Sequence, residues 1–372
     1  MNPHMKSQTL FGAAHGAQGW RTRLPHWRVA GVIAAAVAVA MLAALLLIAL
    51  MGVPVGDALA AFADGAWGSP YAIGASINRS LAFALVGTGF VIANRAKLTN
   101  VGGEGQIAIG GIVATALSLY GGCSHLPLGL SFIVPMLGAA MAGAVWGGVP
   151  GVLKAKAGTN EVISTLLLSF IAVWLLYWCV QSEALLRQPM SNAATLPESL
   201  EIPDLTKLPA IFAASGMNLN IGLPVSVALA FASAILLTRT RFGLSLRAAG
   251  LNAIAAKRAG LPITSSIVGA LALAGAFSGL AGALMLQGDQ YSLKAGFSSG
   301  YGFDGLVVGL LARGSITGVF AAALLFGFLR SGGINMEMIA QVPSALVLIV
   351  QGVVTIALAG GAMWLDRGDA RQ

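Results

Sequence analysis

The stretch VAGVIAAAVAVAMLAALLLIAL at residues 29–50 decides the fold class. It contains no charged residue, and it is long enough for one helical crossing of a bilayer, which takes about 20 residues. The strands of a membrane barrel would alternate apolar and polar residues, and this stretch does not. Because backbone polar groups must be satisfied internally in lipid, the chain is expected to cross as helices.

The composition of all 372 residues extends this prediction to the whole chain. Only 9% of the residues are charged and 57% are hydrophobic, with 49 glycines and a mean hydropathy of +0.84. A soluble surface needs roughly 25–35% charged residues. A soluble enzyme and a disordered chain are therefore both excluded, and the expected fold class is all-α: a polytopic transmembrane helical bundle.

Apolar blocks, separated by charges and by Gly/Pro clusters, divide the chain into about ten spans. They lie near 30–51, 76–94, 104–120, 128–150, 161–180, 223–238, 263–287, 301–312, 315–330 and 343–364. The eighth block is too short to cross alone, so we expect it to form two half-depth helices or a buried hairpin with its neighbour.

The N-terminus resembles a signal peptide, because Ala58-Leu59-Ala60 after the first block has the small residues of a cleavage site. However, the apolar core of a signal peptide has about 7–15 residues, and this block is longer. We therefore expect an uncleaved first span. The predicted organisation is a cytoplasmic tail (1–28), a transmembrane domain (29–365) that contains a cytoplasmic loop at 239–262, and a second cytoplasmic tail (366–372).

The net charge of +8 has two readings: attraction to nucleic acid or anionic lipid, or the Lys/Arg excess of cytoplasmic loops. We favour the second reading and expect no nucleic-acid partner. With both termini inside, every cytoplasmic segment carries basic residues: Lys6, Arg21, Arg23, Arg28, Arg95, Lys97, Lys154, Lys156, Arg239, Arg241, Arg247, Lys257, Arg258, Arg313, Arg367 and Arg371.

Several kinds of chemistry lack their residues. No Lys follows a Gly, so no phosphate-binding loop is present, and no cofactor is expected in this chain. The four histidines lie outside the predicted spans, and Cys123 and Cys179 match no metal-ligand spacing, so two free thiols are favoured over a disulfide. Only Glu104, Glu161 and Asp304 fall near membrane depth, too few for a proton relay.

Two polar stretches interrupt the apolar blocks. LTNVGGEGQ at 98–106 places a carboxylate and two amides at a Gly-rich helix break, as substrate pathways do; a loop in which the acid caps a helix start is the alternative. GTNEVISTL at 158–166 has the same two readings. The candidate pathway residues are Asn100, Glu104, Gln106, Asn160, Glu161 and Asp304.

The loop at 239–262 is expected to contain a short Ala-rich helix. Asn252 is the predicted N-cap, and Gly260 followed by Pro262 ends the helix. Small residues with basic flanks favour a docking surface for a cytoplasmic partner; a basic loop at lipid headgroups is the alternative.

Four motifs, in order over about residues 75–355, resemble one family. LTNVGGEGQIAIGG, GTNEVISTLLLSFIA, GLSLRAAGLNAIAAKRAG and YGFDGLVVGLLARGSITGVFAAALLFGFLRSGG are similar to the signatures of permease subunits of ABC importers in the branched-chain amino acid/ribose superfamily, nucleoside-type branch. The sequence departs from the pattern at Thr99 and Gly103, and the N-terminal tail lies outside it.

The resemblance implies a bacterial inner-membrane subunit that imports a nucleoside or similar small polar solute. It implies three protein partners: a cytoplasmic ABC ATPase that binds ATP, a second homologous permease, and an extracytoplasmic substrate-binding lipoprotein or periplasmic protein. The predicted ATPase-coupling residues are Arg247, Gly250, Asn252, Ala255, Ala256, Arg258 and Gly260. A self-sufficient secondary transporter or channel is the alternative function.

An acidic residue precedes Gly at the head of the third and the eighth span, as Glu104-Gly105 and Asp304-Gly305. This likeness suggests an inverted repeat in which spans two to five correspond to spans seven to ten. In that arrangement the two acids would brace helix starts on opposite faces of the membrane.

Overall fold

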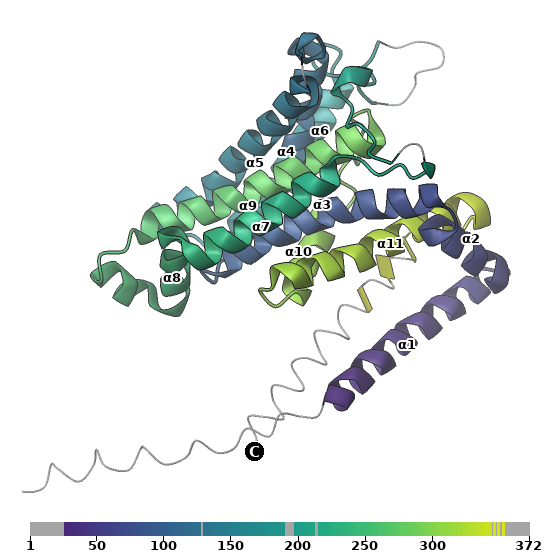
Figure 1. Cartoon of the computed structure of the whole chain (residues 1–372), viewed down its shortest axis with the longest axis horizontal. Coiled ribbons are helices and arrows are strands. Elements are labelled where there is room, and N and C mark those ends of the chain that lie inside the picture. Colours follow the sequence, from purple (N-terminus) through teal and green to yellow (C-terminus); the bar gives the residue numbers. More distant parts are fainter. Residues whose placement is uncertain are drawn as a thin grey trace, which may run out of the picture.

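The computed structural model describes residues 26–127, 129–189, 197–212 and 215–343, with 345–346, 348–349 and 352–353 (Figure 1). Within these residues the fold is the predicted all-helical bundle. Its helices are α1 (His26–Leu50), α2 (Val55–Trp67), α3 (Pro70–Asn94), α4 (Gly103–Tyr120), α5 (Leu130–Ala157), α6 (Glu161–Gln181), α7 (Gly222–Arg239), α8 (Arg241–Arg258), α9 (Ile263–Met285), the π-helix η4 (Leu286–Gln290), α10 (Tyr301–Leu311) and α11 (Ile316–Ala340), with the 3₁₀ turns η1 (Cys123–His125) and η2 (Asp204–Thr206).

Six described helices are long and apolar enough to cross a membrane: α3, α5, α6, α7, α9 continued by η4, and α11. The eighth predicted span is short, as expected, because α10 has 11 residues. Its neighbour α11 has 25 residues, so the first alternative, two half-depth helices, is wrong, and the buried hairpin stays a prediction. The sequence did not predict α2, and most of the tenth span (343–364) lies outside the described residues. The number of ten spans stays a prediction.

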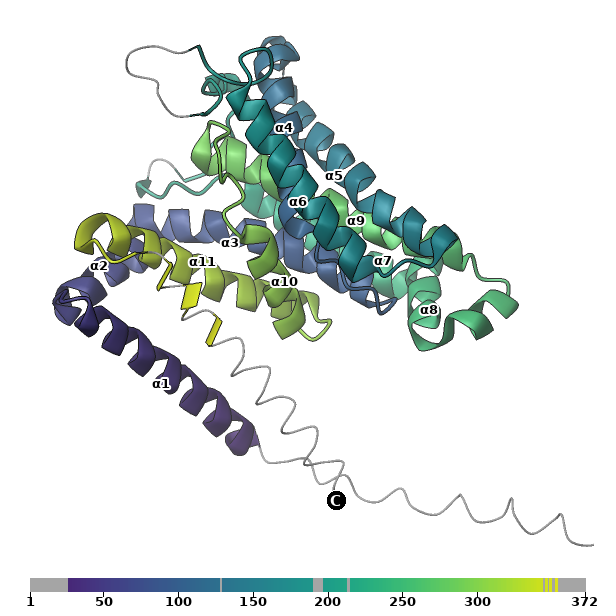
Figure 2. The ribbon, with the colours of Figure 1, turned by 180° about the vertical axis from the view of Figure 1, so that it is seen from behind.

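The bundle has two different ends (Figures 1 and 2). At the first, which we call the α8 end, the Arg95 side chain donates to the Gly314 carbonyl at 2.8 Å and so ties the end of α3 to the α10–α11 turn. At the opposite end, the segment after α6 is bound to η4 and to the loop that follows it by backbone bonds: Leu208 N–H to the Gln287 carbonyl, and Ser199 N–H to the Leu293 carbonyl.

The helix contacts have the pattern that an inverted repeat would produce. In the centre α3 packs on α9; α11 packs along α3 as α5 packs along α9, and α10 contacts α3 as α4 contacts α9. Exchanging α3–α4–α5 with α9–α10–α11 therefore maps each of these contacts onto another. The two-fold relation between the repeats stays a prediction.

Glycines allow α4, α5 and α9 to cross at backbone contact. A Cβ atom at Gly110 would lie on the backbone of Gly279, and one at Gly143 on the Gly275 carbonyl. Such close approach of small residues is a main source of stability where lipid replaces water around helices.

Adjacent glycines of α5 provide a matched test of this packing. A Cβ at Gly147 would lie 2.5 Å from the Leu271 carbonyl oxygen, whereas one at Gly148 meets only the Ala272 side chain at 3.7 Å. We expect Gly147→Ala to lower the thermal midpoint of the detergent-solubilised chain. Gly148→Ala is expected to keep or slightly raise it, since Ala favours a helix over Gly by roughly 0.5–1 kcal/mol. Equal midpoints for the two variants would contradict the crossing.

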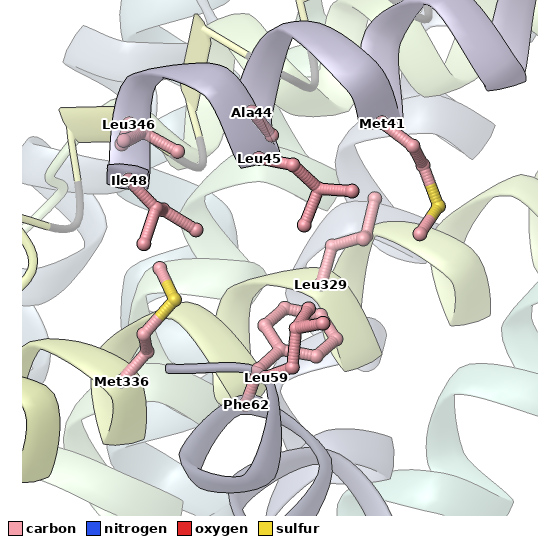
Figure 3. A pocket seen from close by; sticks show the side chains of 9 residues that line it. All are labelled: Met41, Ala44, Leu45, Ile48, Leu59, Phe62, Leu329, Met336 and Leu346. Carbon is pink, nitrogen blue, oxygen red and sulfur yellow. The ribbon is translucent and has the colours of Figure 1, made fainter. Parts of the chain in front are cut away.

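The hairpin of α1 and α2 encloses an apolar cavity against α11. Its volume is about 140 Å³, and Figure 3 shows its lining: Met41, Ala44, Leu45, Ile48, Leu59, Phe62, Leu329, Met336 and Leu346. Both ribbon views show α1 standing apart from the central helices, to which α2 connects it (Figures 1 and 2).

The two cysteines are free and buried. Burial raises the pKa of the Cys123 thiol in η1, so this thiol stays protonated and unreactive near neutral pH.

Candidate functional site

Two helix starts meet in the middle of the bundle, at a point we call the α4–α10 junction. The Glu104 carboxylate, in the first turn of α4, accepts from the Gly300 N–H at 2.9 Å and from the Gly302 N–H at 2.8 Å. Glu104 is 7% exposed. One buried carboxylate thus satisfies two free N–H groups at the start of α10, where its charge also suits the helix dipole.

The local sequence explains this contact. A Cβ on Gly302 would overlap the backbone of Glu104, so the two helix starts meet only because this position has no side chain. The loops that precede α4 and α10 lead the chain back into the bundle before each helix begins. The prediction that Glu104 and Asp304 lie on opposite faces is therefore wrong, because both helices start at one junction.

Asn100 and Gln106 satisfy each other inside the bundle. Asn100 Nδ2 donates to Gln106 Oε1 at 3.0 Å, and Gln106 Nε2 donates back to Asn100 Oδ1 at 3.3 Å. Asn100 Oδ1 also accepts from the N–H of Gly102, the residue just before α4, and so holds the loop that leads into this helix. Both side chains are buried, at 6% and 1% exposure. This geometry favours a role in holding the helix break over direct contact with a solute.

Asn160 and Glu161 lie at the start of α6, at the α8 end. Asn160 Oδ1 accepts from the Val162 N–H at 2.9 Å, which is the N-cap arrangement, and Glu161 pairs with Lys154 at 2.7 Å. Thr165, one turn further along α6, accepts from the Val101 N–H and so ties this helix to the loop before α4. The capping interpretation of these two residues is therefore the better one.

Asp304 lies in the first turn of α10, beside the junction. It interacts electrostatically with Glu104 and with Arg330 of α11, and its buried Oδ2 has no hydrogen-bond partner. Among the predicted pathway residues, the structure thus gathers Asn100, Glu104, Gln106 and Asp304 around the junction.

The kinked helix α8 forms a surface at its own end of the bundle. At Asn252 the backbone leaves the helical region (φ −158°, ψ 99°), and the side chain accepts from the N–H groups of Ile254 and Ala255 at 3.1 and 3.0 Å. Gly260 follows with φ +81°. These are the predicted cap and the predicted end of the short helix.

The predicted coupling residues divide between two faces of α8. Gly250 and Ala256 are buried, and a Cβ at Gly250 would lie 2.5 Å from the Arg95 carbonyl oxygen, so this face packs on the end of α3. The exposed members are Arg247, Asn252, Ala255, Arg258 and Gly260.

The predicted coupling residues do not include the apolar part of this surface. Leu251 is 84% exposed and Ile254 is 69% exposed, on a segment rich in Lys and Arg. The signal was available, because two large apolar residues flanking the cap of a basic helix have no reason to face water. Together with Ala255, Lys257 and Arg258 they form what we call the α8 surface.

Similarity to known proteins identifies the family of this chain. The pattern of the branched-chain amino acid transport system permease component matches residues 72–359. The chain belongs to this permease family. It is similar to the guanosine ABC transporter permease protein of Bacillus subtilis, with 30% identity over 87% of this chain and 91% of the relative.

Two further relatives of the permease are named for other solutes. The glucose ABC transporter permease protein of Haloferax volcanii is 33% identical over 75% of this chain and 74% of its own length. The nucleoside ABC transporter permease protein of Lactococcus lactis is 29% identical over 77% and 80%. No solved structure matches the permease.

The permease is thus a multi-pass membrane subunit of an ABC importer. Among the described residues, no three His, Cys, Asp or Glu side chains are close enough to hold a metal ion.

Proposed function

We propose that the permease imports a nucleoside or a similar small polar solute with several hydroxyl groups, using ATP hydrolysed by a separate cytoplasmic ABC ATPase. The relatives are named for guanosine, glucose and nucleosides, and riboflavin appears in the name of a further one. These solutes differ in their ring systems and share a hydroxylated sugar or sugar-derived chain.

The observation that carries the proposal is the α8 surface. Leu251 and Ile254 are exposed beside Lys257 and Arg258, so an apolar centre has a basic rim. Stable protein interfaces have this composition, in which buried apolar anchors supply most of the binding energy. An ATPase with an apolar groove and acidic edges fits it.

The α8 surface is connected to the C-terminal end of α10, the helix whose start lies at the α4–α10 junction. The buried face of α8 packs on the Arg95 backbone through Gly250, and the Arg95 side chain holds the Gly314 carbonyl in the α10–α11 turn. A displacement of α8 by two closing ATPase subunits would therefore move the end of α3 and the end of α10 together. Movement at both would switch the pathway between outward-facing and inward-facing states.

The basic residues assign the orientation in this proposal. The α8 end carries Lys154, Arg247 and Lys257 and would face the cytoplasm, with both chain termini, in a bacterial inner membrane. The opposite end would receive solute from an extracytoplasmic binding lipoprotein or periplasmic protein. A second, homologous permease would complete the pathway.

The proposed function is tested by the energy source that uptake requires. In cells that express the permease with its ATPase and binding protein, uptake of labelled guanosine, glucose or riboflavin is expected to require an ATPase able to hydrolyse ATP. It is expected to persist when an uncoupler collapses the proton gradient while glycolysis maintains ATP. Uptake by the permease alone, abolished by the uncoupler, would instead establish a self-sufficient secondary transporter.

A further inference from the structure

Four charged side chains gather around Tyr301, on the opposite-end side of the α4–α10 junction: Arg79 of α3, Asp289 of η4, Asp304 of α10 and Arg330 of α11. Gln290 follows Asp289 in η4 and donates to the Phe297 carbonyl at 3.2 Å, in the loop before Tyr301. We call these five side chains the polar cluster. Ionisable groups within membrane helices are rare because they are costly to bury, and those present commonly serve function.

Arg79 connects three elements of the cluster. Its Nη1 donates to the Ser331 hydroxyl of α11 at 2.6 Å, and its Nε lies 3.5 Å from Asp289 Oδ2. The second contact is an ion pair whose geometry does not make a hydrogen bond, so Nε stays unpartnered.

Arg330 occupies the other side of Tyr301. Its Nη2 donates to the Ser299 carbonyl at 2.9 Å, and its guanidinium carbon lies 5.2 Å from the centre of the Tyr301 ring. Asp304 interacts electrostatically with Arg330. Within the cluster two cations thus balance two carboxylates, and Glu104 of the junction, outside the cluster, also interacts with Asp304.

Hydrogen-bonding capacity in the cluster is left unused. Among the described residues, eight buried side-chain nitrogen or oxygen atoms have no hydrogen-bond partner, and four of them are here: Arg79 Nε, Gln290 Oε1, Asp304 Oδ2 and Arg330 Nε. Native proteins satisfy nearly all buried polar groups, so this concentration points to a bound molecule or water.

The backbone around the cluster is irregular as well. The last turn of α9 continues as the π-helix η4, and Tyr291 and Ser299 have left-handed backbone angles, with φ of +58° and +39°. Isolated π-helical turns and strained residues are concentrated at functional sites.

The unused atoms define the ligand chemistry. The cluster offers two N–H donors and two oxygen acceptors, and a hydroxyl group can meet both kinds because it donates and accepts. The aromatic ring is not free for stacking, since Phe83 covers one face of Tyr301 (centroids 4.6 Å apart, planes 6° apart) and Arg330 lies against the ring as well. Hydroxyl groups are therefore better partners than a flat base.

We propose that Arg79, Gln290, Asp304 and Arg330 form a contact site for the hydroxyl groups of the neutral solute as it passes through the permease. The proposal rests on the proposed function and adds the residues and the solute groups that meet. The site binds hydroxyl groups of the sugar or polyol part of the solute, and other contacts bind its ring system.

The experiment compares each solute with an analogue that lacks one or more of its hydroxyl groups, in the full importer with its ATPase and binding protein. The pairs are guanosine with 2′,3′-dideoxyguanosine, glucose with 2-deoxyglucose, and riboflavin with lumiflavin. Asp304→Asn and Gln290→Leu are expected to lower initial uptake of the fully hydroxylated member about tenfold and to leave the other nearly unchanged. Because each variant is compared with the wild type, the preference of the binding protein cancels.

Two control variants isolate the cluster. Ser226→Ala removes a buried, unpartnered hydroxyl of α7, and Glu201→Gln neutralises a carboxylate of the 197–212 segment that pairs with Lys207. Both are expected to keep the wild-type ratio between the members of a pair. Immunoblots of membranes normalise uptake to the amount of each variant.

The outcomes separate the two proposals. If the wild type imports solute but the cluster variants lower both members of a pair equally, the cluster is structural and this inference is overturned. If the wild type shows no ATP-dependent uptake of any member, the proposed function and this inference both fail.

Discussion

Glu104→Ala is expected to abolish import and to lower the thermal midpoint of the permease by about 5 °C or more. The substitution leaves the N–H groups of Gly300 and Gly302 without an acceptor inside the bundle. Each unsatisfied buried donor costs roughly 1–3 kcal/mol, and the start of α10 also loses a favourable charge. A few kcal/mol shifts the midpoint of a large domain by several degrees.

Glu104→Gln provides the graded comparison. Its amide oxygen can replace one of the two carboxylate acceptors, so an intermediate midpoint and reduced uptake are expected. Glu183→Ala removes an exposed carboxylate after α6 and serves as the matched control. Unfolding of detergent-solubilised protein and initial uptake in cells give the two readouts. A Glu104→Ala variant that unfolds and imports like the wild type would contradict this role of the Glu104 carboxylate at the start of α10.

Ile254→Asp is expected to separate the permease from its ATPase and leave the permease folded. Ile254 is 69% exposed, so most of its side chain faces away from the rest of the chain. In a complex, however, it would place a carboxylate in the apolar centre of the interface. Loss of a central anchor typically costs at least 2 kcal/mol, so association should weaken about 30-fold or more.

Co-purification of the ATPase from membranes measures this effect, and the thermal midpoint of the isolated permease checks the fold. Leu205→Asp is the matched control, because Leu205 is 64% exposed in η2 at the opposite end of the bundle. Retention of the ATPase by Ile254→Asp, or its loss from Leu205→Asp, would falsify the assignment of the α8 surface.

Features that depend on neighbouring residues could be predicted from the sequence. The cap at Asn252 and the helix end at Gly260 need only the residues between them, and the structure has both. The short length of α10 follows in the same way from the turn residues around it.

Features that depend on residues distant in the chain could not be predicted from the sequence. Nothing near Glu104 shows that its carboxylate binds Gly300 and Gly302, almost two hundred positions later. Asn100 and Gln106 were recognised as polar groups at a helix break, but the sequence does not show that they satisfy each other.

Arg330 explains why the predicted ninth span (315–330) is shorter than α11. The charge of Arg330 interrupts the apolar block and so predicts the end of the span, yet the helix continues to Ala340. The guanidinium is tolerated there because it faces the bundle, where the Ser299 carbonyl and the Tyr301 ring hold it. The same inward-facing charge then becomes part of the polar cluster.

The α4–α10 junction has a consequence for biogenesis. The loop before α4 is held by its own Asn100, whereas the start of α10 is capped by Glu104, which belongs to the earlier half of the chain. Ribosomes deliver the earlier half to the membrane first. The earlier half therefore already carries Glu104 when α10 is made, and the start of α10 folds against this carboxylate.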